Sequence, residues 1–491
     1  MIKKPTFGPL IGHITCDYIN IWVGENFDQD DSTNKIYAIL ILNNEKNYQI
    51  QLKHYDNNSG VFHINYLLPN TTYNMKICIS DDKLYDPFKI IQSNIFEEIN
   101  VRTLPNPIFS GTGTIALFSC HYPVPYKKSD KMFKYLKDVL DRSDYNNTPI
   151  LCHVGDQIYA DQLNRFIPIR RADSAREFQE LYEKKFSGKY FSSLVREYPS
   201  IMILDDHEIE DNWCMDRLKS REVYQNSRDL FTCAISAYKI YQASHGPNCP
   251  DINNSKLFYN FNIGVYPFFV LDARTDRYVE TGDLLGKNAP DSQLNQLCEW
   301  LKLQHNDVPK FIISSCTFVP FTYSDIEDMD NGVGDNWAKF PKTRASLNKF
   351  IVDNNIQKVV FLSGDVHNSM ALTINLESNG RNLQMYQIVS SALFWDFPFA
   401  DGDITNYIVD TKKYEGKKPS LFDRIFKRKK KASFKFKDSN NESWKMHYIL
   451  HENSYTQLNN FAIINFSLDD IDIKWYGENS ELLAEHKFIF D

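Results

Sequence analysis

The amino-acid sequence predicts an α/β domain preceded by a small antiparallel β-sandwich. From about residue 10 to residue 101, apolar and polar residues alternate in short stretches separated by Asn, Asp and Gly, a pattern typical of antiparallel strands with one buried face. After residue 113 the apolar runs become continuous and alternate with helix-like segments, which indicates sheets buried on both faces. We therefore expect two unequal domains, a sandwich at 1–104 and a larger domain at 105–491.

These patterns assign elements in order along the chain. The alternating N-terminal stretches are INIWV, IYAILIL, YQIQL, GVFHINYLL and YNMKICIS. The segment TLPNPIFSGTG at 103–113 is rich in Pro and Gly, so we expect it to link the two domains. The continuous apolar runs that follow are TIALFSC, PILCHV, SIMILDD, YPFFVLD, KFIISSC, KVVFLSG and MYQIVSS. The helix-like segments between them include 172–186, 291–304 and 342–354.

The composition excludes some classes of protein. Of the 491 residues, 42% are hydrophobic and 14% aromatic, which is enough apolar surface for a core and excludes a wholly disordered chain. The formal net charge of −8 argues against a general nucleic-acid-binding surface, and we expect no sequence-specific binding of nucleic acid. Nine cysteines without a CxxC pair favour reduced thiols. The N-terminal residues form no uninterrupted apolar segment, so the sequence predicts a cytoplasmic protein without a signal peptide or a transmembrane segment.

Polar side chains gather where the apolar runs of the larger domain end. These endings read Ser119-Cys120-His121, Gly155-Asp156, Asp205-Asp206-His207-Glu208, Asp272-Ala273-Arg274 and Gly364-Asp365-Val366-His367. Asp and Asn commonly form turns after strands, which would explain any one position alone. In α/β sheets, however, functional groups collect at the carboxyl ends of strands, and several converging carboxylates without a cation would repel one another. The set as a whole therefore favours a metal site.

The order and spelling of the motifs resemble the PhoD-like alkaline phosphatases, a branch of the calcineurin-like metallophosphoesterase superfamily. The resemblance runs the length of the chain and includes FGPLIGHITCDYINIWV, SC after the linker, GDQIYAD, DDHEIEDNW, FFVLDARTDR, SSCTFVP, DNWAKFPKTR and FLSGDVHNS. It implies a four-layer αββα core behind an N-terminal β-sandwich of immunoglobulin or fibronectin type. It also implies a metal-dependent phosphomonoesterase or phosphodiesterase.

The resemblance further implies a centre that holds Fe³⁺ with Ca²⁺, in which Asp156 bridges the ions. Thiolate and phenolate are anionic donors that stabilise a trivalent ion, which suits Cys120 and Tyr159 as iron ligands. The other implied ligands are Asp206, Asn212, Asp365 and His367. Mn²⁺, Zn²⁺ and Mg²⁺ stay open as alternatives.

Neighbouring polar residues have different expected roles. Adjacent side chains on a regular strand point to opposite faces, so we expect Asp206, and not Asp205, to reach the site. Asp161 and Glu208 are expected to orient an imidazole or the backbone, as ligating histidines commonly require. His153 lies inside a predicted strand, where packing in the core is the simpler interpretation.

The implied reaction is attack on phosphorus by a hydroxide that the metal ions hold. Asp156, His207 and Arg274 are the expected catalytic residues, with His207 contacting phosphate or protonating the leaving oxygen. His207 and His121 are candidates for binding the substrate, which we expect to be a phosphorylated small molecule, a phospholipid or a phosphodiester.

Two arginines have an alternative explanation. Arg274, together with the substrate-binding candidate Arg277, could present planar donors to phosphate oxygens. Structural ion pairs with Asp272 or Asp276 would explain both arginines equally well.

A basic segment at 412–437 interrupts the resemblance, within a departure from the family pattern at about 409–445. Leu421, Phe422, Ile425 and Phe426 fall at helical spacing beside its lysines, as in helices that lie on anionic membranes, so peripheral membrane contact or a lid over the site is one interpretation. A solvated, partly disordered insertion is the other. The segment also allows a rival function, a catalytically silent scaffold that binds a membrane or a protein. That function predicts missing ligands, whereas every expected ligand position is filled.

Overall fold

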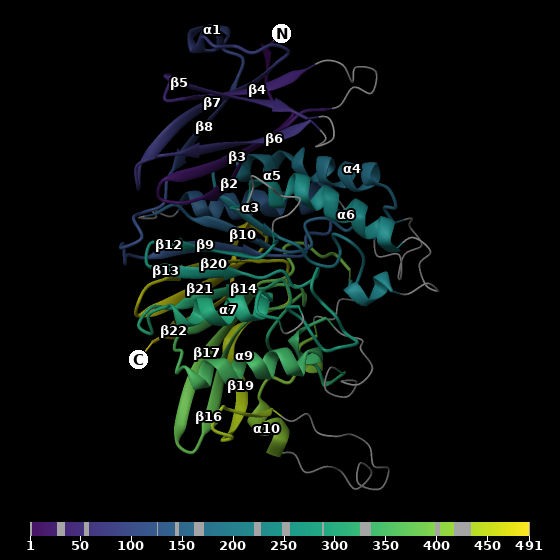
Figure 1. The fold of residues 1–491 in the computed structure, drawn as a ribbon, viewed down its shortest axis with the longest axis vertical. Helices are drawn as coiled ribbons and strands as arrows, with labels where there is room; N and C mark the ends of the chain where they lie inside the picture. Colours follow the sequence, from purple (N-terminus) through teal and green to yellow (C-terminus); the bar gives the residue numbers. More distant parts are fainter. Residues whose placement is uncertain are drawn as a thin grey trace.

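The computed structural model contains four sheets among its described strands, with the N-terminal pair of sheets at one end of the molecule (Figure 1). The structure describes residues 2–26, 35–53, 58–124, 126–142, 147–161, 171–219, 227–247, 256–286, 289–324, 335–397, 403–416 and 434–490.

The N-terminal strands form the expected antiparallel sandwich. One sheet contains β1 (Ile2–Lys3), β4 (Ile36–Leu42), β5 (Lys46–Leu52), β7 (Thr72–Ser80) and β8 (Glu97–Arg102), and the other contains β2 (Phe7–Ile14), β3 (Tyr18–Gly24) and β6 (Ser59–Asn65). Ile21 of β3 and Leu40 of β4 belong to one apolar core, because alternate residues of each strand face the opposite sheet. Strands β1 to β8 pair only with one another among the described strands. The domain boundary at residue 104 stays a prediction.

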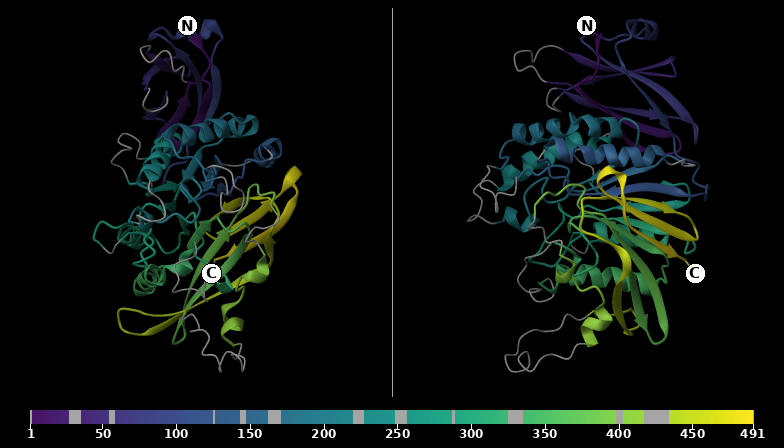
Figure 2. Two further views of the ribbon diagram at one scale, coloured as in Figure 1. Left: turned by 90° about the vertical axis from the view of Figure 1, so that its right-hand side faces the viewer. Right: turned by 180° about the vertical axis from the view of Figure 1, so that it is seen from behind.

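Two larger sheets make up the rest of the chain. A six-stranded sheet has the order β11 (Ser200–Ile203), β10 (Ile150–Val154), β9 (Gly113–Phe118), β20 (Phe461–Phe466), β21 (Asp470–Tyr476) and β22 (Leu482–Ile489). An eight-stranded sheet has the order β12 (Tyr259–Ile263), β13 (Tyr266–Val270), β14 (Lys310–Ile313), β15 (Val359–Ser363), β17 (Arg381–Val389), β16 (Ser369–Ser378), β19 (Ser443–Thr456) and β18 (Lys435–Lys437). The C-terminal strands, yellow in Figure 2, contribute to both sheets.

Helices cover the outer face of each large sheet, which gives the expected four-layer αββα arrangement. The six-stranded sheet is covered by α3 (Lys131–Arg142), α4 (Ala175–Phe186), α5 (Lys189–Val195) and α6 (Ser227–Tyr241), which lie between this sheet and the N-terminal sandwich (Figure 1). The eight-stranded sheet is covered by α7 (Gln293–Lys302) and α9 (Pro341–Asp353). The inner faces of the two sheets share a core that includes Leu117 and Leu362.

The predicted helices at 172–186, 291–304 and 342–354 correspond to α4, α7 and α9. Ser174 accepts the amide of Glu177, and the Glu177 side chain accepts the Ser174 amide, so this capping box fixes the start of α4. The other helices of the described residues are short: α1 (Pro87–Ser93), α2 (Tyr126–Ser129), α10 (Thr411–Gly416) and the 3₁₀ turns η2 (Met215–Leu218), η3 (Ala243–His245), η5 (Trp337–Lys339), η6 (Ile404–Asn406) and η7 (Glu478–Ser480).

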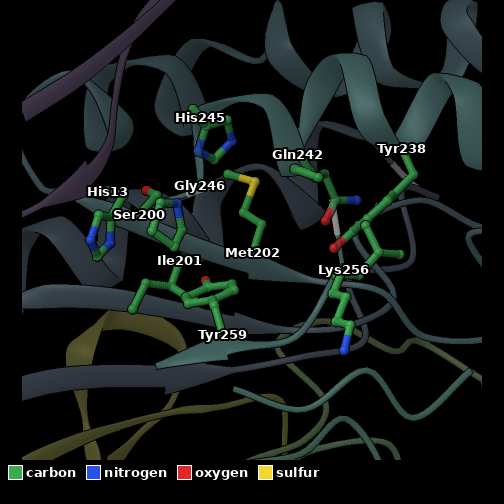
Figure 3. Close-up of a pocket in the computed structure, with 13 residues that line it drawn as sticks. His13, Ser200, Ile201, Met202, Tyr238, Gln242, His245, Gly246, Lys256 and Tyr259 are labelled. Carbon is green, nitrogen blue, oxygen red and sulfur yellow. The ribbon is translucent and has the colours of Figure 1, made fainter. Parts of the chain in front are cut away.

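The N-terminal sandwich packs directly on the second domain. Trp22 Nε1 donates a hydrogen bond to the Ile240 carbonyl oxygen at 3.0 Å. A Cβ atom on Gly12 would lie 2.4 Å from the carbonyl oxygen of His245, so glycine is required for this close approach. A pocket at the same junction is lined by His13 from β2 and His245 from η3 (Figure 3). Two imidazoles are therefore enclosed between the domains.

This junction predicts a loss of stability in acid. Burial lowers the pKa of His245 from 6.5 to about 3, and that of His13 to about 4. Below pH 6.5 the unfolded chain takes up protons that the folded chain excludes, so the free energy of unfolding decreases as the pH falls towards these values. Between pH 7 and pH 5, we expect His245→Phe to lose about 2 kcal/mol less of its free energy of unfolding than the parent protein. Denaturant unfolding at both pH values measures this difference, and equal losses would contradict the prediction.

Two further expectations concern cysteines and membranes. The eight cysteines among the described residues are free thiols, as expected. Within the described part of the chain, no helix combines the length and apolar character needed to cross a membrane. Residues 417–433, which carry most of the basic segment and its four apolar residues, lie outside the described residues, so membrane contact and the lid stay predictions.

Candidate active site

Four strand ends from both large sheets bring the predicted ligands together. Strands β9, β10 and β11 are parallel neighbours, so their carboxyl ends meet at one edge, and β15 adds a fourth end from the facing sheet. At these ends Cys120, Asp156, Asp365 and His367 have φ values of 55°, 55°, 71° and 49°. Non-glycine residues rarely adopt this left-handed conformation, and residues held in it cluster at functional sites. The backbone is therefore in an unusual conformation at these four ligand positions.

Cys120, Asp156 and Tyr159 form the first part of the site. The Asp156 Oδ2 atom lies 3.3 Å from Cys120 Sγ and 3.4 Å from Tyr159 Oη. Burial raises the pKa of the Cys120 thiol and of the Tyr159 phenol well above their usual values, and the Asp156 charge raises both further. Without a cation, the three groups could not all be ionised. Together they offer the anionic sulfur and oxygen donors that suit a trivalent transition metal.

Carboxylates extend the site in a second direction. Ligand atoms of Asp156, Asp206 and His207 lie within 4.8 Å of one another, and so do those of Asp205, Asp206, Asp335 and Asp365. Asp206 is common to both groups. Burial and the neighbouring carboxylates raise the pKa of Asp365 well above its usual range.

The donor chemistry of these residues fits bound cations. Burial also raises the pKa of Asp156 well above its usual range. Its Oδ1 atom is buried and has no hydrogen-bond partner among the described residues. An unpaired buried carboxylate oxygen costs free energy unless a cation compensates it. The all-oxygen group of four aspartates suits a hard cation such as Ca²⁺.

His207 lies beside this group and is held by Asp161, as expected. Its Nδ1 atom is 3.0 Å from both carboxylate oxygens of Asp161, and its ring centroid is 4.3 Å from that of Tyr159. Burial lowers the pKa of His207, but the charges of Asp161, Asp206 and Asp156 outweigh burial and raise it well above its usual range. Asp161 therefore fixes the ring and favours the protonated imidazole.

Glu208 holds two of the ligand loops together, in agreement with the role expected for it. Its carboxylate accepts the backbone N–H groups of Asp156 at 3.1 Å, Gln157 at 2.6 Å and Asp205 at 2.9 Å. Gln242 Nε2 donates a fourth bond at 3.3 Å. One buried carboxylate thus fixes the loop after β10 relative to the loop after β11.

The remaining predicted ligands differ in how they reach the site. His367 is half-buried, and burial together with His207 lowers its pKa to about 3, so its imidazole is neutral as a metal ligand requires. Asn212 contacts the carboxylate group through its backbone N–H, which donates to Asp206 Oδ2 at 2.5 Å. The Asn212 side-chain amide donates to Asp211 Oδ1 at 3.0 Å. Ligation by Asn212 stays a prediction.

One expectation about Asp205 was wrong, and one aspartate was missed. Asp205 and Asp206 both reach the site, because β11 ends at Ile203 and the alternation of a regular strand no longer applies to them. Asp335 completes the group of four carboxylates, although it does not directly follow a strand. Only the motif DNWAKFPKTR, which begins with Asp335, marked this position in the sequence.

The two arginines bind carboxylates rather than facing solvent. Arg274 is fully buried; its Nε donates to Asp205 Oδ1 at 2.5 Å and its Nη1 to Asp335 Oδ1 at 2.5 Å. Arg277, also buried, pairs with Asp335 Oδ1 at 2.9 Å. In this structure the guanidinium groups are paired with carboxylates, and contact with phosphate stays a prediction. The ion-pairing alternative is supported by these contacts, with Asp205 and Asp335 as the partners that the structure shows in place of the expected Asp272 or Asp276.

The side chain of His121 is buried in this structure, and its contact with the substrate stays a prediction. Its ring is 3% exposed and lies 4.7 Å from the ring of Phe133, and its Nδ1 atom is 2.8 Å from the buried Nζ atom of Lys185. The side chain therefore packs under the helices, although its backbone N–H donates to the Asp156 carbonyl oxygen at 3.1 Å. His153 lies in the core, as expected, with its ring 4.4 Å from that of Phe118.

The chain is similar to known phosphatases in sequence and in fold. Alkaline phosphatase D of Bacillus subtilis (strain 168) is 24% identical over 262 residues, which cover 46% of this chain and 42% of that protein, less than half its length. A solved structure of PhoD matches with a TM-score of 0.68 at 16% identity, covering 100% of this chain and 91% of that one. The purple acid phosphatase PPD1 of yellow lupin (Lupinus luteus) matches with a TM-score of 0.55 at 11% identity, covering 98% and 74% of the two chains.

The family comparison covers the elements that carry the site. The model of the PhoD-like phosphatase family matches residues 115–443, a range that contains all the predicted ligands from Cys120 to His367. Because the match includes more than half of the chain, this protein belongs to the PhoD-like phosphatase family.

Proposed function

We propose that this protein is a metal-dependent hydrolase of phosphate esters, acting on monoesters, diesters or both. The observation that carries the proposal is the position of Asp156, whose carboxylate lies beside the Cys120 thiol and the Tyr159 phenol and also belongs to the group with Asp206 and His207. A bridging carboxylate between two cations needs this arrangement. Family membership supports the same chemistry.

The donor sets support different cations on the two sides of Asp156. Cys120 and Tyr159 would hold an iron-type ion, whereas Asp205, Asp206, Asp335 and Asp365 would hold one or more Ca²⁺ ions, with the neutral His367 as a further candidate ligand. When bound, such cations would acidify a water molecule and neutralise charge on the phosphoryl oxygens.

The chain's own groups supply orientation and a proton. Asp161 occupies Nδ1 of His207, so Nε2 is the nitrogen left to donate a proton to the leaving oxygen of the ester. Glu208 keeps Asp156 and Asp205 at a fixed separation through their backbone N–H groups. Arg274 compensates the negative charge of Asp205 and Asp335 and keeps them in place, so it acts as a positioning residue.

Hydrolysis of two model esters tests the proposal. We expect the purified protein to release nitrophenol from nitrophenyl phosphate, from bis-nitrophenyl phosphate or from both. A chelator should abolish this activity, and adding back metal should restore it. Iron bound by thiolate and phenolate should also colour the protein, and elemental analysis identifies the ions. Full activity in chelated protein that contains no metal would contradict the proposal.

A further inference from the structure

Aromatic rings line one side of the site, and of these the sequence singled out only Tyr159. Tyr122 follows the strand end that carries Cys120, and its ring centroid lies 5.1 Å from that of Tyr159, 5.6 Å from that of Trp395 and 5.0 Å from that of Phe397. Trp395 and Phe397 are 5.2 Å apart, with their rings inclined by 66°. We call these four rings, Tyr122, Tyr159, Trp395 and Phe397, the aromatic wall.

The aromatic wall is continuous with the reacting groups. The Trp395 ring centroid lies 4.2 Å from that of His367, and the Tyr159 ring centroid lies 4.3 Å from that of His207. A group attached to phosphorus on this side of the site would therefore meet aromatic faces.

The rings of the aromatic wall differ in how deeply they are buried. Tyr122 and Tyr159 are 4% and 2% exposed, whereas Trp395 and Phe397 are only half-buried. The Trp395 backbone is fixed, because its N–H donates to Asn459 Oδ1 at 2.7 Å, yet its indole Nε1 has no hydrogen-bond partner among the described residues. The wall thus has a rigid buried base and an outer part that still exposes apolar ring surface, while the Trp395 N–H itself is buried.

Packing alone does not account for this arrangement. Tyr122 and Tyr159 are already buried. Trp395 and Phe397 stay half-buried beside charged groups, which buries less apolar surface than enclosing them would. Binding sites typically combine such apolar and aromatic walls with a few polar groups that fix the reacting part of the ligand. Here the carboxylates and His207 supply the polar part.

We propose that the aromatic wall binds the organic group of the substrate and selects phosphate esters of flat, apolar alcohols, such as aryl esters, over esters of small polar alcohols. The inference rests on the proposed phosphoester hydrolysis. The ester group stacks on Trp395 and Phe397 while the phosphoryl group lies against the carboxylates. Offset and edge-to-face contacts between aromatic rings favour flat groups over flexible polar ones.

The test compares two substrates in matched variants. For the parent protein and Trp395→Leu, kcat/KM is measured with phenyl phosphate and with glycerol phosphate, and the ratio of the two values is formed for each protein, which cancels general damage to the metal site. We expect the ratio to fall about fivefold in Trp395→Leu, mainly through a higher KM for the aryl ester. Trp395→Phe keeps a ring and should retain most of the preference. Tyr85→Leu, at a side chain that is 77% exposed in the N-terminal sandwich, is the control and should leave the ratio unchanged.

A second variant keeps the test possible if the first one does not fold. If Trp395→Leu does not fold, Phe397→Leu is measured in the same way and should lower the ratio in the same direction. An unchanged ratio in the folded variants of an active parent overturns the role of the wall and leaves the proposed function intact. A parent protein that cleaves neither ester when loaded with metal overturns the proposed function itself.

Discussion

Asp156→Asn is expected to lower phosphoester hydrolysis by at least about 10³-fold, or about 4 kcal/mol of transition-state stabilisation. The carboxylate lies within 3.4 Å of both Cys120 Sγ and Tyr159 Oη and also joins the group with Asp206. An amide removes the negative charge that two cations would share, and it offers one acceptor oxygen in place of two. Both sides of the site should therefore lose metal affinity.

The fold should survive this substitution. Asp156 has a φ of 55°, and asparagine tolerates the left-handed conformation better than most residues. Its backbone N–H still donates to Glu208 Oε2 at 3.1 Å. The matched control is Asp82→Asn, an exposed position in the N-terminal sandwich, which should keep full activity. Steady-state kinetics and elemental analysis of the parent protein, Asp156→Asn and Asp82→Asn test this prediction. If Asp156→Asn kept most of its activity and its metal, a bridging role for Asp156 would be refuted.

The fold was predictable from the sequence because the strands and helices of each layer have a characteristic pattern of apolar residues. Strands buried on both faces, such as β10 with the run ILCHV, read as continuous apolar segments. In contrast, β6 alternates between buried and more exposed residues from Val61 to Asn65. The helix α4 begins where a capping box marks its start. These signals are local, so neighbouring residues suffice to detect them.

The site was predictable only where its residues follow strands. Asp156, His207 and Asp365 come directly after apolar runs, and the parallel pairing of strands gathers such positions. Asp335 comes more than twenty residues after β14, and Trp395 lies in an irregular segment after β17, so no periodic pattern points to either. Their roles depend on contacts between segments distant in the sequence.

The local sequence pattern also does not reveal which residues a charged side chain pairs with. Arg274 lies two residues after Asp272 in a strand-end motif, but Asp272 accepts only the backbone N–H of Arg274, at 3.0 Å. The Arg274 guanidinium instead reaches Asp205 and Asp335, which are 69 and 61 residues away. The planar fork of arginine can serve two carboxylates at once. Only the meeting of the two sheets brings those carboxylates to one guanidinium.

Arg274→Met is therefore expected to lower the free energy of unfolding by about 3–5 kcal/mol in chelator-treated protein. The guanidinium is fully buried and pairs with Asp205, Asp335 and, at 3.5 Å, Asp206, so its removal leaves buried carboxylates without a counter-charge. With metal bound the loss should be smaller, because cations would compensate the same carboxylates.

The control for this change is an arginine whose ion pair is open to solvent. Arg381 is half-exposed and pairs with Glu442, and exposed pairs contribute at most about 1 kcal/mol, so Arg381→Met should have a small effect that metal does not alter. Denaturant unfolding of both variants and the parent, each with and without metal, gives the comparison. A loss for Arg274→Met no larger than that for Arg381→Met in chelated protein would show that the carboxylates do not need Arg274 for charge balance. A loss that metal leaves unchanged would instead place the cations away from Asp205, Asp206 and Asp335.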